Sequence, residues 1–186
     1  EKKLFKGYSG KARIVSGIAP LVAAIVLSSR AVPPTPLAHL AGWCVVLLVG
    51  LIVNYTALAY WFLFNAEAGR NPIMLKPAID AVPSLAVGAM LSVALILADQ
   101  YNLLFGVWMC LYGLAQMSYR QSLPVGIYIV GLCYLVSGSY CLISPDISFT
   151  DPWPMGIVFC LGEIAGGVVL MRDTDSDRSP LQEGAR

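Results

Sequence analysis

The sequence is poor in charge. Only 12% of its 186 residues are Asp, Glu, Lys or Arg, about half the share found in an average soluble domain. So few charges cannot cover the surface of a water-soluble globule of this size, and they also exclude a disordered chain. The charges nearly cancel, with 12 Lys and Arg against 11 Asp and Glu, which argues against a nucleic-acid-binding protein.

Residue types that carry chemistry are also scarce. There is a single histidine, His39, and the five cysteines form no Cys-x-x-Cys motif, so the sequence predicts no metal site, haem site or redox pair. Phosphate-binding glycine loops, His-Glu-x-x-His and Gly-x-Ser-x-Gly are missing as well. We therefore expect a protein that is not an enzyme and has no cofactor.

Apolar residues, in contrast, make up 58% of the chain. Several apolar stretches approach or exceed the length of about 17–25 residues that a membrane-spanning helix needs. They cover residues 14–29, 37–64, 77–98, 103–119, 124–143 and 154–171. A polar tail at 172–186 follows and is expected to be frayed. The sequence thus predicts an all-α polytopic integral membrane protein, with residues 1–171 forming a six-helix transmembrane bundle.

The distribution of basic residues orients this bundle. With six spans, every Lys and Arg except Arg30 lies on one side, and Arg13 is counted there as a residue that flanks the first span. Arg30 lies on the other side with Asp99, Asp146 and Asp151. Because cytoplasmic loops carry the excess of Lys and Arg, both termini are predicted to be cytoplasmic. We expect the protein in a bacterial plasma membrane.

Glu163 is the main candidate for a functional residue. It lies roughly 13 Å into the last predicted span at 1.5 Å per residue, near the bilayer centre, where an acid is expected to face the bundle interior. No Lys or Arg lies inside a predicted span, so we expect Glu163 to be protonated or held by neutral donors, with Asn54 and Tyr112 at the same depth. Two interpretations stay open: a proton or substrate path, or a carboxyl that joins helices. In either case Glu163→Gln is expected to keep the fold.

A second candidate site is the cytoplasmic rim. Asp80 lies one turn inside the 77–98 span, and Arg70, Lys76 and Arg120 are predicted near it. Arg120 is the preferred partner, because Pro77 separates Lys76 from the helix that carries Asp80. The rim group is expected to be either a structural ion pair or a gate that binds anions.

Small residues at a spacing of four mark faces on which helices can approach closely. The pairs are Gly162 with Gly166, Ala19 with Ala23, and Gly88 with Ser92. Such faces serve either packing within the bundle or the docking of another membrane subunit.

These features favour a non-enzymatic subunit or interaction partner within a membrane complex, including a homo-oligomer. The alternative is a small transporter or substrate-binding module in which Glu163 meets a small-molecule ligand. In size and topology the chain is similar to the substrate-capturing components of vitamin importers, and Ala19 and Ala23 resemble their small-residue docking face. A lipid-modifying enzyme is least favoured, since no nucleophile and base are paired. The expected surroundings are the lipid bilayer and no nucleic acid.

Overall fold

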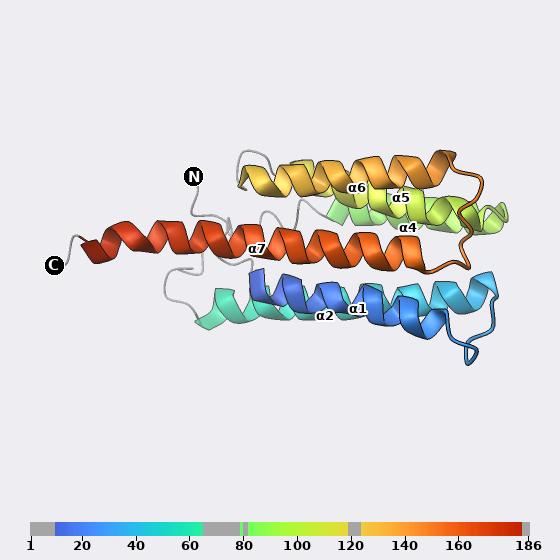
Figure 1. Cartoon of the computed structure of the whole chain (residues 1–186), viewed down its shortest axis with the longest axis horizontal. Helices are drawn as coiled ribbons and strands as arrows, with labels where there is room; N and C mark the ends of the chain where they lie inside the picture. Colours follow the sequence, from blue (N-terminus) through green and yellow to red (C-terminus); the bar gives the residue numbers. More distant parts are fainter. Residues whose placement is uncertain (1–9, 65–78, 80–81, 119–123, 184–186) are drawn as a thin grey trace.

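The computed structural model describes residues 10–64, 79, 82–118 and 124–183, and in this part the chain forms helices and no strand. The prediction of an all-α fold is confirmed. The helices run side by side along one axis (Figure 1). They are α1 (Gly10–Leu27), α2 (Pro36–Phe64), α4 (Val82–Leu97), the 3₁₀ turn η4 (Tyr101–Leu103), α5 (Leu104–Ser118), α6 (Val125–Ile143) and α7 (Trp153–Glu183).

Four of these helices, α1, α2, α6 and α7, are long and apolar enough to cross a membrane. The described part of α4 has 16 residues and α5 has 15, about 24 Å or less at 1.5 Å per residue. Both run alongside the longer helices (Figure 1). Length and composition therefore support four spans directly.

Two helix boundaries differ from the predicted ones. The first span was expected to begin at residue 14, but α1 already begins at Gly10, so Arg13 lies inside the helix rather than in its flank. At the other end α7 continues to Glu183, through most of the tail expected to be frayed. No Gly or Pro lies between Met171 and Ser179, so nothing in that stretch stops the helix.

Neighbouring helices follow a simple order across the bundle. The pairs α2–α1, α1–α7, α7–α6, α6–α5 and α5–α4 pack together, and the two most extensive interfaces are α1–α7 and α5–α6. The beginning of α1 and the end of α7 lie at the same end of the bundle (Figure 1). The central helices α1, α7, α6 and α5 therefore form the core, while α2 and α4 flank it.

Glycines allow helices α5 and α6 to approach each other closely. A Cβ atom on Gly113 of α5 would lie 2.6 Å from the carbonyl oxygen of Gly131 on α6, and a Cβ on Gly106 would lie 2.8 Å from that of Gly138. Such distances leave no room for a methyl group. Because apolar burial does not drive helices together in lipid, close backbone approach of this kind is what holds the pair.

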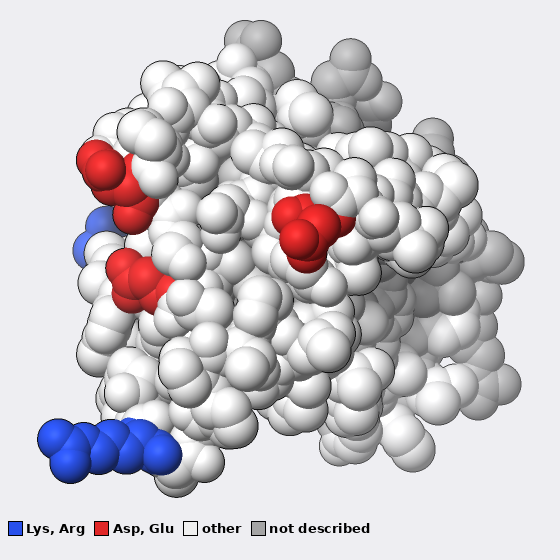
Figure 2. All heavy atoms as spheres, turned by 90° about the vertical axis from the view of Figure 1, so that its right-hand side faces the viewer, with Lys and Arg blue, Asp and Glu red and all other residues white. Residues whose placement is uncertain are grey.

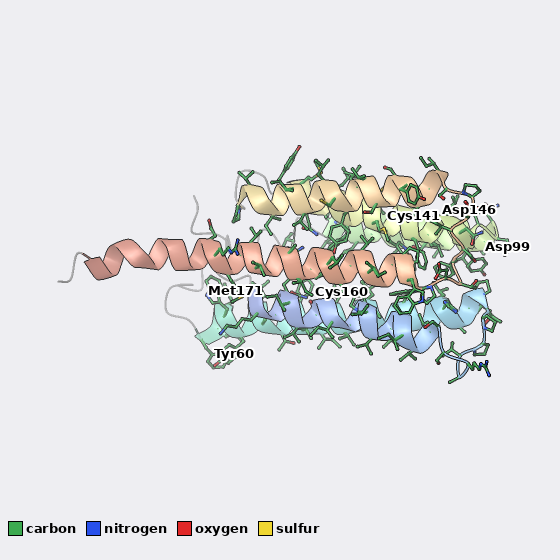
Figure 3. All side chains as sticks on the ribbon, viewed as in Figure 1. Tyr60, Asp99, Cys141, Asp146, Cys160 and Met171 are labelled. Atoms are coloured by element: carbon green, nitrogen blue, oxygen red, sulfur yellow. The ribbon has the colours of Figure 1, made fainter. Side chains whose placement is uncertain are left out.

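Aromatic side chains close one end of the core. Phe149, from the segment between α6 and α7, lies 4.8 Å from Phe105 between ring centroids, and its backbone N–H donates to Asn102 Oδ1 at 2.9 Å. Figure 2 looks onto this end and shows a few separate acidic groups and a protruding basic side chain on a mostly uncharged surface. Asp99 and Asp146 lie there (Figure 3) and are exposed.

Candidate functional site: a buried ion pair at the centre of the bundle

Glu163 lies on α7, ten residues beyond Trp153, which is about 15 Å along the helix. Its side chain faces the bundle interior, and the residue is only 6% exposed. Cys160, one turn away on α7, marks this level in Figure 3. The backbone of Gly17 on α1 comes so close that a Cβ atom there would lie 2.6 Å from the Cβ of Glu163.

Arg13 of α1 forms an ion pair with Glu163. Its Nε donates to Oε2 and its Nη2 donates to Oε1, each at 3.0 Å, so the guanidinium binds both carboxylate oxygens with its planar fork. The two side chains are 11% and 8% exposed. The expectation that no cation lies inside a span to pair with Glu163 is wrong, because Arg13 is a helical residue whose long side chain reaches along α1 into the core.

Two tyrosine hydroxyls complete the shell of the carboxylate. Tyr112 of α5 donates to Oε1 at 2.7 Å, and Tyr134 of α6 lies 3.2 Å from the same oxygen. Tyr134 Oη is also 3.3 Å from the carbonyl oxygen of Phe159. The rings of these three residues pack on one another, with centroids 5.0 to 5.3 Å apart. One carboxylate thus joins α1, α5, α6 and α7.

Asn54 reaches this centre through α1. Its amide donates to Ser16 Oγ at 3.1 Å and to the carbonyl oxygen of Gly50 at 2.9 Å. Ser16 Oγ in turn donates to the backbone carbonyl of Arg13 at 3.0 Å. Of the two residues predicted at the depth of Glu163, Tyr112 therefore contacts the carboxylate, and Asn54 supports the helix that carries its counter-charge.

Glycines make room for the large side chains of the site. A Cβ on Gly166 would lie 2.6 Å from Arg13 Cζ, and a Cβ on Gly162 would collide with the phenol ring of Tyr134. The predicted pair Gly162 and Gly166 therefore faces two different helices, α6 and α1, within the bundle.

The other small residues lie elsewhere. Ser92 Oγ of α4 donates to the carbonyl of Gly88 and accepts from Trp108 Nε1, each at 2.7 Å, and so links α4 to α5. Ala19 and Ala23 of α1 are half-buried, and Ala23 packs against the aromatic core. The rim residues Arg70, Lys76, Asp80 and Arg120 lie outside the described residues.

Sequence reasoning missed three contributors to the centre: Arg13, Tyr134 and Gly17. Arg13 and Gly17 stand four residues apart on one face of α1, and Gly10 precedes Gly17 by seven, a spacing that marks a close-packed helix face. Within the described residues, no group of three or more His, Cys, Asp or Glu could hold a metal ion. The arrangement binds one carboxylate firmly, and its chemistry is that of an internal ion pair.

Loss of either tyrosine hydroxyl is expected to weaken the bundle. Tyr112→Phe and Tyr134→Phe should each lower the free energy of unfolding by about 0.6 kcal/mol and by no more than about 1.7 kcal/mol, the average and the maximum measured for hydrogen bonds between membrane helices. Tyr112→Phe should cost more, because the hydroxyl of Tyr112 lies 2.7 Å from Oε1 of Glu163 and that of Tyr134 lies 3.2 Å from it. Unfolding in mixed micelles by titration with sodium dodecyl sulfate measures this. Tyr140→Phe, an exposed tyrosine of α6, is the control, and an equal loss there would contradict the assignment.

Comparison of the chain with models of known families, with curated proteins and with solved structures gave no significant match.

Proposed function

We propose that the chain is a six-span integral membrane protein with both ends on the cytoplasmic side of a bacterial plasma membrane. The parallel course of α4 and α5 beside four longer apolar helices supports the span count (Figure 1). In the described segments that join helices at the end away from Gly10, Arg30 is the one basic residue beside the acids Asp99, Asp146 and Asp151, and so low a share of Lys and Arg is typical of the outer side.

We further propose that the protein is a non-enzymatic subunit or partner in a membrane complex. The observation that carries this proposal is that both carboxylate oxygens of Glu163 already have hydrogen-bond donors from the chain. Oε1 accepts from Arg13, Tyr112 and Tyr134, and Oε2 accepts from Arg13. A carboxylate occupied in this way stabilises one arrangement of four helices. It suits a rigid scaffold better than a site that takes up and releases a substrate.

The flank formed by α4 is the surface we assign to a partner. None of the residues of Val82–Leu97 is buried, and this helix packs mainly against α5. Its exposed side combines large apolar residues such as Met90 and Leu97 with small ones such as Ala86 and Ala89. Small residues between large ones let a second helix approach closely in lipid.

Native mass spectrometry of the gently solubilised protein tests this assignment. We expect wild type to carry a second copy or another membrane chain, and Ala89→Trp to lose it because the indole would block close approach. Val136→Trp, an equally bulky change at an exposed position of α6, should keep the complex. A wild-type protein that carries only lipid, or an Ala89→Trp protein that keeps its partner, would overturn the proposal.

Transport remains the second candidate, because one observation favours it. Tyr112 is only half-buried, yet its hydroxyl holds Glu163 at 2.7 Å, so a polar group connects the centre with a less enclosed part of the bundle. Proton flux into liposomes that contain the purified protein distinguishes the two functions. Flux in wild type that disappears in an Arg13→Gln/Glu163→Gln double variant would favour transport over the scaffold.

A further inference from the structure

One turn of α2 carries buried side-chain nitrogens that have no hydrogen-bond partner among the described residues. They are Nδ1 and Nε2 of His39 and Nε1 of Trp43. The two residues are 1% and 3% exposed, and their spacing of four places them on the same helix face. This turn lies near the start of α2, at the end of the bundle opposite Gly10 (Figure 1).

A second tryptophan near this turn, Trp108, has a hydrogen-bond partner for its indole N–H. Trp108 contacts the same phenylalanine as Trp43, and its Nε1 donates to Ser92 Oγ at 2.7 Å. A buried donor without a partner costs about 1–3 kcal/mol, and native proteins satisfy nearly all such groups with their own atoms, with ordered water or with a bound ligand. The partner of His39 and Trp43 is therefore expected to come from outside the chain.

The surroundings restrict what that partner can be. Trp43 stands edge-on to Phe105 at 5.7 Å between ring centroids, and Phe105 lies 4.8 Å from Phe149. Among the described residues, the buried charged side chains are Arg13 and Glu163, which bind each other. An ionic ligand at Trp43 would therefore find no free buried counter-charge, whereas a flat uncharged ring would pack against aromatic neighbours.

We propose that His39 and Trp43 bind the head group of an uncharged, membrane-soluble molecule of the quinone class. The indole donates one hydrogen bond, and a neutral imidazole donates one and accepts one. The carbonyl oxygens of a quinone accept from the two N–H groups, and the hydroxyl of the corresponding quinol can donate to the remaining imidazole nitrogen. The nitrogens are enclosed, so binding has to displace a neighbouring side chain. Phe149 is the one we expect to move, because a loop carries it.

Calorimetric titration of the purified full chain in detergent with a short-tailed benzoquinone tests the site. A compound with the same tail and a benzene ring in place of the quinone measures partition into the micelle. We expect saturable binding of the quinone to wild type, and a dissociation constant at least about tenfold higher in His39→Leu and in Trp43→Phe, as the loss of one hydrogen bond predicts. Trp153→Phe, an exposed indole at the same end, should leave the constant unchanged.

His39→Leu removes two unpaired buried nitrogens and is expected to fold at least as well as wild type in the absence of quinone. Trp43→Phe removes one such nitrogen but also leaves a cavity, so a small loss of stability is expected there. The proposal would be overturned by binding isotherms that are the same for the quinone and its benzene analogue, or the same for wild type and both variants. Diacylglycerol, which offers ester carbonyls without a flat ring, is the third ligand in the titration. If it binds as tightly as the quinone and with the same dependence on His39 and Trp43, the site belongs to a lipid and the quinone assignment fails.

Discussion

Glu163→Gln is expected to lower the free energy of unfolding by about 3–5 kcal/mol, the cost of removing one partner from a buried ion pair. The amide has nearly the shape of the carboxylate, but it leaves the guanidinium of Arg13 in the bundle core without a counter-charge. Sequence alone predicts that this variant keeps the fold, because the isosteric amide retains hydrogen bonding without a titratable proton. The ion pair with Arg13 is the reason to expect a loss of stability instead. Unfolding in mixed micelles by titration with sodium dodecyl sulfate gives the measurement.

A double-mutant cycle separates the ion pair from other effects of the substitution. Arg13→Gln alone should cost a similar amount, because it leaves the carboxylate buried with only the two tyrosine hydroxyls. The double variant Arg13→Gln/Glu163→Gln carries no net charge in the core and should lose clearly less than the sum of the singles. Strictly additive losses would show that the two side chains do not stabilise each other. Glu163→Lys places two cations side by side and is expected to prevent folding.

The sequence predicted part of this centre because depth in a membrane can be counted from the ends of the spans. Glu163 and Tyr112 were placed at one level, and in the structure the hydroxyl of Tyr112 lies 2.7 Å from the carboxylate. The same depth count does not predict Arg13 in the centre, since a basic residue near the beginning of an apolar stretch is normally a flanking residue. Only the contact between α1 and α7 shows that its side chain extends toward the core.

Helix contacts were the less predictable part of the fold. The spacing of small residues four apart predicts a close-packed face at Ala19 and Ala23, yet the glycines of α1 that lie closest to α7 are Gly10 and Gly17. On α5 and α6 the close contacts likewise join Gly106 with Gly138 and Gly113 with Gly131. All of these glycines repeat after seven residues within their helix, the spacing at which a side chain returns to the same face after two turns. Spacing identifies such a face, but the partner helix depends on how the bundle is assembled.

These contacts lead to the second large effect, at the glycine positions themselves. Gly17→Ala would place a methyl group 2.6 Å from Glu163 Cβ, and Gly113→Ala would place one 2.6 Å from the carbonyl oxygen of Gly131. Neither neighbour is the end of a flexible side chain, so the helices have to move apart. We expect each variant to lose about 1–3 kcal/mol, as overpacked cores do, and Gly17→Val and Gly113→Val to lose more. The same detergent titration measures all four.

Gly50 provides the matched control, since it lies within α2 and a Cβ atom there would meet nothing within 4 Å. Gly50→Ala should therefore keep or slightly raise stability, because alanine favours a helix over glycine by about 1 kcal/mol. The effects of glycine replacement at the α1–α7 interface and at the α5–α6 interface can also be distinguished. Gly17→Ala should weaken the coupling between Arg13 and Glu163 in the double-mutant cycle, since it moves α1 away from α7, whereas Gly113→Ala acts between α5 and α6 and should leave that coupling intact. If Gly50→Ala were as damaging as Gly17→Ala, the loss would reflect glycine replacement in general, and close packing at the α1–α7 seam would not be its cause.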